Sequence, residues 1–564
     1  MGSDPTGAFG AIRRRPWPSL LALLILVSTA LLIGLRANIG FFLDDWDLVI
    51  VRSGASDWLL PHNEHIILIP AALYEASLSV FGMTAMPIHL VGVALFETSV
   101  LLLFFWLRTQ IGEPTAVLGC AVVLFLGAST ADLVWPFQVG YFGSFAGGLG
   151  ALLLLRRNTA TDDAKACLLL VVSLLFSSMF LPFVVAAAVQ LLYRDDGRPN
   201  LAALRSRAWV FLVPVALFVV WWLGWGHTAK SFITVENALK VPLFTLSALG
   251  YSAASLTGVF PLREVTTSFL WAVPGLIVCA GFAFVLGRRR QIPPEFLLAA
   301  GAALVFWVLA CLNFIPGRDF VASRYQYPSV IFLLMMLAGA CSGLRPGRQL
   351  FRGLAALTVV AVAINAAALI YIFNHTYKVY EGRNLSGMTA LDISRGTVVP
   401  GFGIAIGTDG AGAHIDADTY FNAVDRYGSP GWDDEEIEAA SEEDRSRIDT
   451  ILVGALRVRL VPAKRVSPLA RTCRIAAATE AIGDPVTVTS PVLLIEPEKT
   501  VGIYLGRFGP DASAPAWGAV GGVPTGYLIP SGRSDRPWRI GFKGEGKVRV
   551  CDARLAPETG DPEK

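Results

Sequence analysis

The sequence has few charged residues for its length. Asp, Glu, Lys and Arg make up only 16% of its 564 residues, whereas hydrophobic residues make up 54%. A soluble domain carries about 25% charged residues. This deficit argues against a wholly soluble protein and predicts long segments in contact with a lipid bilayer. The formal net charge is only +2, so no overall basic character points to a nucleic-acid partner, and none is expected.

Cysteine is also scarce, and none of the seven cysteines forms a CxxC pair. This absence argues against a structural zinc site of the usual spacing. Five cysteines lie in or near apolar runs and are interpreted as small core residues. Cys473 and Cys551 are the two in the polar last third. If that third is extracytoplasmic, its compartment permits a disulfide between them, although spacing alone leaves the pairing open.

Long apolar runs occupy the first two thirds of the chain and predict membrane-spanning helices of roughly 20 residues each. We interpret eleven runs as spans: 18–35, 86–107, 115–128, 139–155, 166–179, 181–193, 208–226, 268–287, 295–313, 327–343 and 353–373. The first follows Arg13 to Arg15 and lacks a clean cleavage site, so it is expected to remain as a span. The two short runs around Ser177 and Ser178 predict a tight helical hairpin.

The distribution of charge predicts the orientation in a plasma membrane. Lys and Arg gather in the segments that are cytoplasmic if the N-terminus is cytoplasmic. Everything from residue 374 onward is then extracytoplasmic. The outer segments 36–85 and 227–267 are long, and their stretches 65–80 and 236–256 are predicted to be helices on the outer membrane surface.

The composition divides the chain into three parts: a membrane domain at 1–373, a helical extracytoplasmic region at 374–456, and a β-rich region at 457–564. Four acidic residues starting at Asp433 favour the first turn of a helix. Alternating segments in the last part predict a β-sandwich similar to carbohydrate-binding modules; they are 457–461, 486–496, 500–506, 526–530, 538–542 and 547–551. Trp517, Tyr527 and Trp538 are candidates either for stacking on sugars or for the core.

An acidic cluster follows the first predicted span. Asp44, Asp45 and Asp47 lie within four residues of one another, around Trp46. Carboxylates this close repel, so their pKa values are expected to separate. One could then act as a general base near neutral pH while a neighbour stays ionised and binds substrate.

The same outer loop contains His62, Asn63, Glu64 and His65. We predict that His62, Glu64 and His65 bind substrate together with Asp47. A divalent metal on these side chains is the alternative, but the spacing differs from the H-E-x-x-H zinc motif. An aspartate that activates a hydroxyl needs no metal, so no cofactor is required by this hypothesis.

Two further groups lie on the predicted outer face. Arg324 and Tyr325 precede a late span; a guanidinium there suits a lipid phosphate, and an interfacial aromatic belt is the alternative. Asp132, Trp135 and Gln138 lie between two spans and are candidates to line the same site. Glu97 and His89, inside a predicted span, are interpreted as polar contacts within the bundle, Glu97 also as a functional candidate.

With these residues in place, the sequence resembles the GT-C class of membrane glycosyltransferases over 12–373. The resemblance is carried by Asp44-Asp45 after the first span, by His62 and His65, and by Arg324-Tyr325. It implies a polyprenyl-phosphate-linked sugar as donor, Asp44 as the base with Asp45 as alternate or partner, and Arg324 on the donor phosphate.

The β-rich region is similar to those of actinobacterial arabinofuranosyltransferases, which implies a cell-envelope glycan as acceptor. The Asp-Asp pair departs from the frequent Asp-Glu, and His-Asn-Glu-His replaces the His-Pro-Pro of protein mannosyltransferases. The competing hypotheses are a transporter or flippase of lipid-linked precursors and a non-catalytic envelope scaffold.

Overall fold

The computed structural model describes residues 16–52, 54–193, 198–262, 268–406 and 413–556. The basic residues 13–15 and 194 used in the orientation argument lie outside these ranges. The chain forms two compact units. The first contains the described part of Met1–Phe41, Arg52–Ser77 and Ala85–Tyr377; the second contains Phe42–Val51, Leu78–Thr84 and the described part of Lys378–Lys564.

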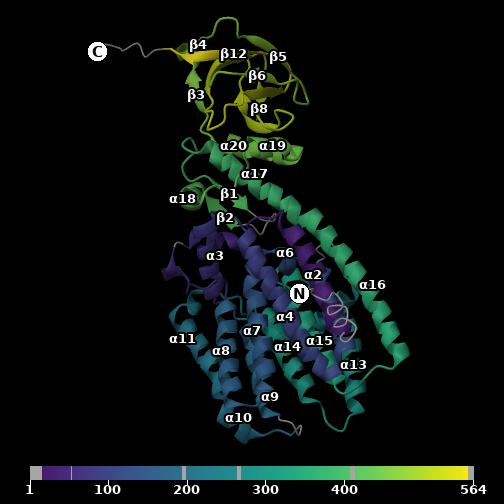
Figure 1. Cartoon of the computed structure of the whole chain (residues 1–564). Helices are drawn as coiled ribbons and strands as arrows, with labels where there is room; N and C mark the ends of the chain where they lie inside the picture. Colours follow the sequence, from purple (N-terminus) through teal and green to yellow (C-terminus); the bar gives the residue numbers. More distant parts are fainter. Residues whose placement is uncertain (1–15, 53, 194–197, 263–267, 407–412, 557–564) are drawn as a thin grey trace, which may run out of the picture. The chain divides into compact units, whose positions relative to one another are not determined.

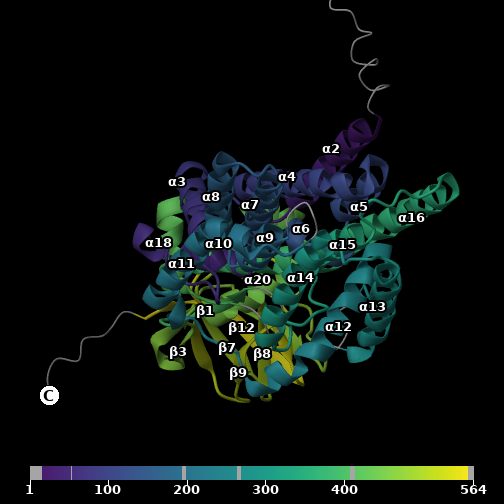
Figure 2. The ribbon, with the colours of Figure 1, turned by 90° about the horizontal axis from the view of Figure 1, so that it is seen from below.

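The first unit is a bundle of helices (Figures 1 and 2). Its longer helices are α2 (Pro16–Arg36), α4 (Met86–Ile111), α5 (Glu113–Leu124), α7 (Val139–Leu155), α8 (Ala160–Phe176), α9 (Phe180–Leu192), α11 (Trp209–Gly224), α12 (Val235–Thr257), α13 (Ala272–Gly287), α14 (Pro294–Leu312), α15 (Gln326–Ala340) and α16 (Arg348–Ile372). The short helices α6 (Thr130–Val134), η4 (Pro136–Gln138) and η7 (Ser323–Tyr325) connect them at one end. Helix α3 begins in this unit and runs over Leu68–Phe81.

Six helices in the described residues are long and apolar enough to cross a membrane, or up to eight if each bent pair is one span. The predicted count of eleven is therefore not confirmed. Part of the difference has a local cause, because α9 has 13 residues, fewer than the roughly 20 that a span needs. The hairpin prediction is confirmed, since α8 ends at Phe176 and α9 begins at Phe180.

Helices were expected at 65–80 and 236–256, and α3 and α12 occupy these stretches. Helix α12 lies beside α13 (Figure 2). At their closest approach Gly250 faces Gly275, where an added Cβ would lie about 2.0 Å from backbone oxygens of the other helix. The small residues thus allow the two helices to pack closely. A location on the outer membrane surface stays a prediction.

The second unit combines helices with the β-rich region. Its helices are α17 (Lys378–Ser394), α18 (Ala417–Tyr427), α19 (Asp434–Ala439) and α20 (Glu442–Ala455), with the π-helical turn η1 (Asp47–Val51) from the segment that follows α2. Asp433 caps α19 by accepting from the amides of Glu435 and Glu436, and Glu436 reciprocates in a capping box. The predicted helix start at this acidic run is confirmed.

The region predicted to be β-rich contains two antiparallel sheets, and their arrangement as a β-sandwich stays a prediction. One joins β3 (Arg459–Pro462), β10 (Thr525–Leu528), β7 (Val492–Pro497), β12 (Gly546–Leu555) and β4 (Val466–Pro468), with β5 (Arg474–Ala478) also on β12. The other joins β6 (Val486–Val488), β11 (Trp538–Lys543), β8 (Val501–Gly506) and β9 (Ala514–Ala519). The predicted single strand at 486–496 is in fact two strands in different sheets. Both sheets and α20 contribute to one apolar core.

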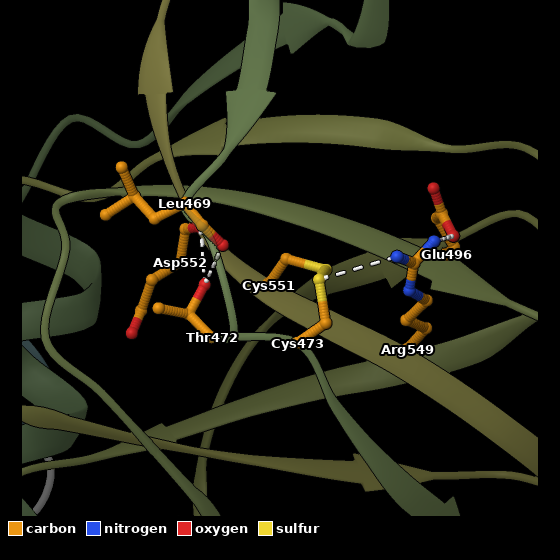
Figure 3. Close-up of a disulfide and its surroundings, with 7 residues drawn as sticks. All are labelled: Leu469, Thr472, Cys473, Glu496, Arg549, Cys551 and Asp552. Carbon is orange, nitrogen blue, oxygen red and sulfur yellow. Dashed lines mark hydrogen bonds and ion pairs between the residues drawn. A yellow bond between two sulfur atoms is a disulfide. The ribbon is translucent and has the colours of Figure 1, made fainter.

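A disulfide joins Cys473, just before β5, to Cys551 in β12 (Figure 3). The pairing left open by the sequence is therefore made, and it links two neighbouring strands. On the same face Arg549 donates toward the Cys473 sulfur at 3.5 Å and pairs with Glu496 at 3.0 Å (Figure 3).

The three aromatic residues proposed for sugar stacking pack against the core of the second unit. Tyr527 is 1% and Trp538 5% exposed, and Trp517 stacks on Tyr527 with ring centroids 5.3 Å apart. Arg507 lies over the Trp538 ring at 4.1 Å. Core packing therefore accounts for all three positions, and sugar binding by them gains no support.

Candidate functional site in the helical unit

The segment carrying His62 to His65 is a tight turn. The backbone amides and carbonyls of His62 and His65 exchange two hydrogen bonds of 3.0 Å, and Asn63 between them has a φ of +51°. Asparagine tolerates this left-handed conformation better than most residues. The turn brings both imidazole rings and the Glu64 carboxylate to one end of the first unit.

Two contacts hold this turn against neighbouring helices. Ser178, in the α8–α9 hairpin, donates to the carbonyl of Glu64 at 3.3 Å. Trp221 of α11 donates through its indole N–H to the carbonyl of Leu59 at 2.8 Å. The segment of His62 to His65 therefore packs against the helical bundle and is not a solvated loop.

The His62 ring also contacts the segment of Trp135 and Gln138. Phe137 lies 4.7 Å from the His62 ring and 5.8 Å from the Trp135 ring, measured between centroids. Gln138 is 2% exposed, and its Oε1 has no hydrogen-bond partner among the described residues. Trp135 and Gln138, both predicted from sequence, thus lie in the same region as His62.

Asp132 lies one turn earlier, in α6, and is completely buried. Ser129 donates to its Oδ2 at 2.6 Å, whereas its Oδ1 has no hydrogen-bond partner within the described ranges. A buried carboxylate oxygen without a donor is costly. This oxygen is therefore a candidate to meet a hydroxyl or a cation of a bound molecule.

Arginines approach from the segment before α15. Arg318 donates to Asn63 Oδ1 at 2.6 Å and lies 4.0 Å from a Glu64 oxygen. Arg324 donates to the carbonyl of Gly317 at 3.0 Å and lies 5.6 Å from the centre of the Tyr325 ring. Ser323 ties this segment to the start of α6, because it donates to the Ala128 carbonyl at 2.9 Å and accepts from the Ala131 amide at 3.0 Å.

Tyr141 of α7 lies within electrostatic range of several of these groups. They are Tyr325, Arg324, Asp132 and Arg318, and the centroid of the His65 ring lies 6.2 Å from that of the Tyr141 ring. Four separate stretches of the first unit therefore contribute residues to this region. We name this set the arginine–carboxylate cluster: Glu64, Asp132, Tyr141, Arg318, Arg324 and Tyr325.

Two members of this cluster were not among the residues predicted for the site. Tyr141 lies inside an apolar run, where an aromatic residue indicates packing. Arg318 was not singled out. The signal that could have done so is its place in the short polar segment between the apolar helices α14 and α15.

Burial raises the pKa of the Glu64 carboxyl above its ordinary value, and the Arg318 guanidinium acts in the opposite direction. Such perturbed groups are concentrated at functional sites, although structural ion pairs show them too.

The predicted catalytic aspartates belong to the second unit. Asp45 is completely buried, and its Oδ2 accepts from the amide of Phe42 at 2.7 Å. Asp44 is half-buried, and Asp47 begins the π-helical turn η1. Leu43, just before the pair, has a φ of +44°, an uncommon conformation for a residue with a branched side chain.

Within the described residues, no group of three or more His, Cys, Asp or Glu side chains is arranged to hold a metal ion. The proposed divalent site on His62, Glu64 and His65 therefore gains no geometric support.

Comparisons with known proteins give limited information. No family model matches the sequence, and no curated protein matches it. Among solved structures, the chain is similar to the arabinofuranosyltransferase AftD from mycobacteria, with 14% identity and a TM-score of 0.41. The match covers 92% of this chain and 40% of that chain, so this chain spans about two fifths of the length of that protein.

Proposed function

We propose that the protein is a membrane glycosyltransferase that moves a sugar from a polyprenyl phosphate to a hydroxyl of an envelope glycan. The observation that supports this most is the arginine–carboxylate cluster. It combines two guanidinium groups with two carboxylates in a unit whose helices are apolar enough to lie in a membrane. A lipid phosphate needs both features at once: arginine for its oxygens and an apolar setting for its tail.

In the proposed reaction the acceptor hydroxyl oxygen attacks the anomeric carbon of the donor. The bond between that carbon and the phosphate oxygen breaks, and the polyprenyl phosphate leaves with the electron pair. The hydroxyl proton passes to Asp44. Arg324 stabilises the negative charge that grows on the leaving phosphate, and Arg318 holds the turn of Asn63 and Glu64 in place.

The surroundings of the two aspartates favour different roles for them. Asp45 is buried and holds the backbone of its own turn through the Phe42 amide, so its carboxylate serves structure. Asp44 is half-buried and remains accessible to a substrate. Asp44 is therefore the proposed base, and Asp45 a positioning residue. The sugar is proposed to be arabinofuranose, on the similarity of the tail to actinobacterial arabinofuranosyltransferases.

The test is transfer by the purified full chain in proteoliposomes, with a polyprenyl phosphate arabinofuranose as donor and an arabinan oligosaccharide as acceptor. Asp44→Asn should lower kcat by at least about a thousandfold, the combined size expected for loss of a general base and its positioning. Asp45→Asn should keep more activity than Asp45→Ala, because an asparagine oxygen still accepts from the Phe42 amide.

Arg324→Ala should raise the donor KM and lower kcat, whereas the exposed Arg348→Ala and Asp484→Asn are matched controls with wild-type rates. Full activity of Asp44→Asn would remove the mechanism. Movement of intact lipid-linked sugar across the bilayer without transfer would favour the transporter hypothesis instead.

A further inference from the structure

The segment with the first-loop aspartates packs with the tail. Phe42–Val51 and Leu78–Thr84 form one compact unit with the residues from Lys378 onward, far along the chain. The sequence suggested a different arrangement, in which the tail is an accessory domain beside a complete catalytic domain. The contacts inside the second unit show what the tail does for the aspartates.

Helix α17 contacts the turn that carries Asp44 and Asp45. The ring of Tyr380 lies 6.0 Å from the ring of Phe42, with the planes tilted by 33°. Phe42 is 4% exposed, and its amide is the donor to Asp45 Oδ2 at 2.7 Å. Phe42 therefore connects the tail to the turn of Asp44 and Asp45: its ring contacts Tyr380, and its amide donates to Asp45.

Helix α18 contacts the other end of the aspartate segment. It packs against η1, in which Leu48 and Val49 are 4% and 1% exposed. Its last residue, Tyr427, accepts from the amide of Met83 at 3.0 Å. Gly82 has a φ of +72°, and a Cβ there would lie 2.7 Å from the Tyr427 carbonyl oxygen. Only glycine allows this close approach without a shift.

The backbone of the aspartate turn is itself under strain. Leu43 has a φ of +44°, a conformation that is unfavourable for a residue other than glycine. Such a conformation persists where surrounding contacts determine it. In the second unit those contacts include Tyr380 on the preceding residue and α18 on the following turn.

We infer that α17 and α18 contribute to catalysis. Tyr380 is a positioning residue for Asp44, and the contact of Gly82–Met83 with Tyr427 holds the segment around Asp44 in the position in which Asp44 acts. This inference rests on the proposed function. It means that the tail determines kcat through the position of the base and is not a separable glycan-binding attachment.

The test uses full-length variants in the transfer assay, with hydrogen–deuterium exchange as an independent readout. Tyr380→Phe should lose the least activity of the three variants, because it keeps the ring contact with Phe42. Tyr380→Leu and then Tyr380→Ala should lower kcat progressively, by about tenfold or more for alanine, with donor KM within about twofold. The amides of 42–51 should exchange faster in the same order.

Gly82→Ala should reproduce the effect of Tyr380→Ala through a different contact. Gly396→Ala is the matched control, because Gly396 also has a positive φ, +85°, but open space around it. Wild-type kcat and exchange in both Tyr380→Ala and Gly82→Ala would overturn the inference. An equal loss in Gly396→Ala would overturn it as well, since strain alone would then explain the result.

The exchange readout separates this inference from the proposed function. If the wild type shows no transfer, the proposed function fails, yet unchanged protection of 42–51 in Tyr380→Ala would still refute the positioning role. If the wild type transfers and Asp44→Asn does not, an active Tyr380→Ala refutes the positioning role alone.

Discussion

The disulfide between Cys473 and Cys551 allows a stability prediction with a worked magnitude. Its partners are 78 residues apart in the chain. In the chain-entropy model, a crosslink with a loop of that size removes about 15 cal/mol/K from the unfolded state, or about 4.5 kcal/mol at 25 °C. Removing the crosslink should therefore lower the free energy of unfolding of the β-rich region by about 2–4.5 kcal/mol, since measured values usually fall below the model.

The perturbation is the double variant Cys473→Ser with Cys551→Ala, because Cys473 is exposed and Cys551 is buried. For a region of about 100 residues, each kcal/mol shifts Tm by roughly 5 °C, so the loss corresponds to about 10–20 °C. The assay is thermal unfolding of the full chain in detergent, and the sensitivity of the tail to a protease reports when the tail unfolds. Cys279→Ser is the matched control, because Cys279 is an exposed free cysteine of the first unit.

Two outcomes would refute this reasoning. A shift of the double variant that is no larger than that of Cys279→Ser would mean that the crosslink does not restrict the unfolded tail. If a reducing agent lowered the Tm of the double variant by the same amount as the substitutions themselves, the effect would belong to some other thiol.

Three further predictions concern the candidate site and its supports. Arg36 is 1% exposed and donates to the carbonyls of Leu133 at 2.7 Å and His89 at 3.1 Å. Arg36→Met should lower the free energy of unfolding by about 3–6 kcal/mol, because two hydrogen bonds of a charged donor are lost. Arg36→Lys should lower it less, and thermal unfolding measures both. Leu43→Gly should keep transfer activity because glycine accepts the positive φ, whereas the β-branched Leu43→Val should lose it; equal rates would contradict the strain argument. Because burial raises the Glu64 pKa, its protonated form is favoured in the folded state, and its contribution to stability is lost as pH rises through that raised value. Glu64→Gln should therefore gain Tm relative to the wild type as the pH rises above the ordinary range of a carboxyl group, and no pH-dependent difference would contradict this.

Local features of the fold were predictable from the sequence. The acidic run at Asp433 predicted a helix start, and the serines at 177–178 predicted the hairpin, because both depend on neighbours within one or two turns. The strands β5 and β9 were missed. Their sequences, RIAAA and APAWGA, have few of the β-branched residues that indicate strands, and pairing with β12 and β8 determines them instead.

The candidate site was predictable only in part, because its members come from distant stretches. His62, Glu64, Trp135, Arg324 and Tyr325 were found as unusual residues in predicted loops. Tyr141, which lies within electrostatic range of Arg324 and Tyr325, was missed, because its position in an apolar run of α7 carries no such signal. The count of eleven spans is not confirmed for a related reason: α5 and the following residues form a pair of helices bent by 43°, and hydropathy does not report a bend.

The second unit is assembled from three stretches of chain, the first two of which are synthesised long before the third. During biosynthesis, Phe42–Val51 and Leu78–Thr84 therefore leave the ribosome before any of the tail exists to pack against them. The buried side chains Leu48 and Val49 must remain uncovered, or be covered by something else, until Ala417–Tyr427 has been made. Assembly of the acidic turn is thus a late event. A nascent or truncated chain would lack the contacts from the tail that hold its aspartates in position.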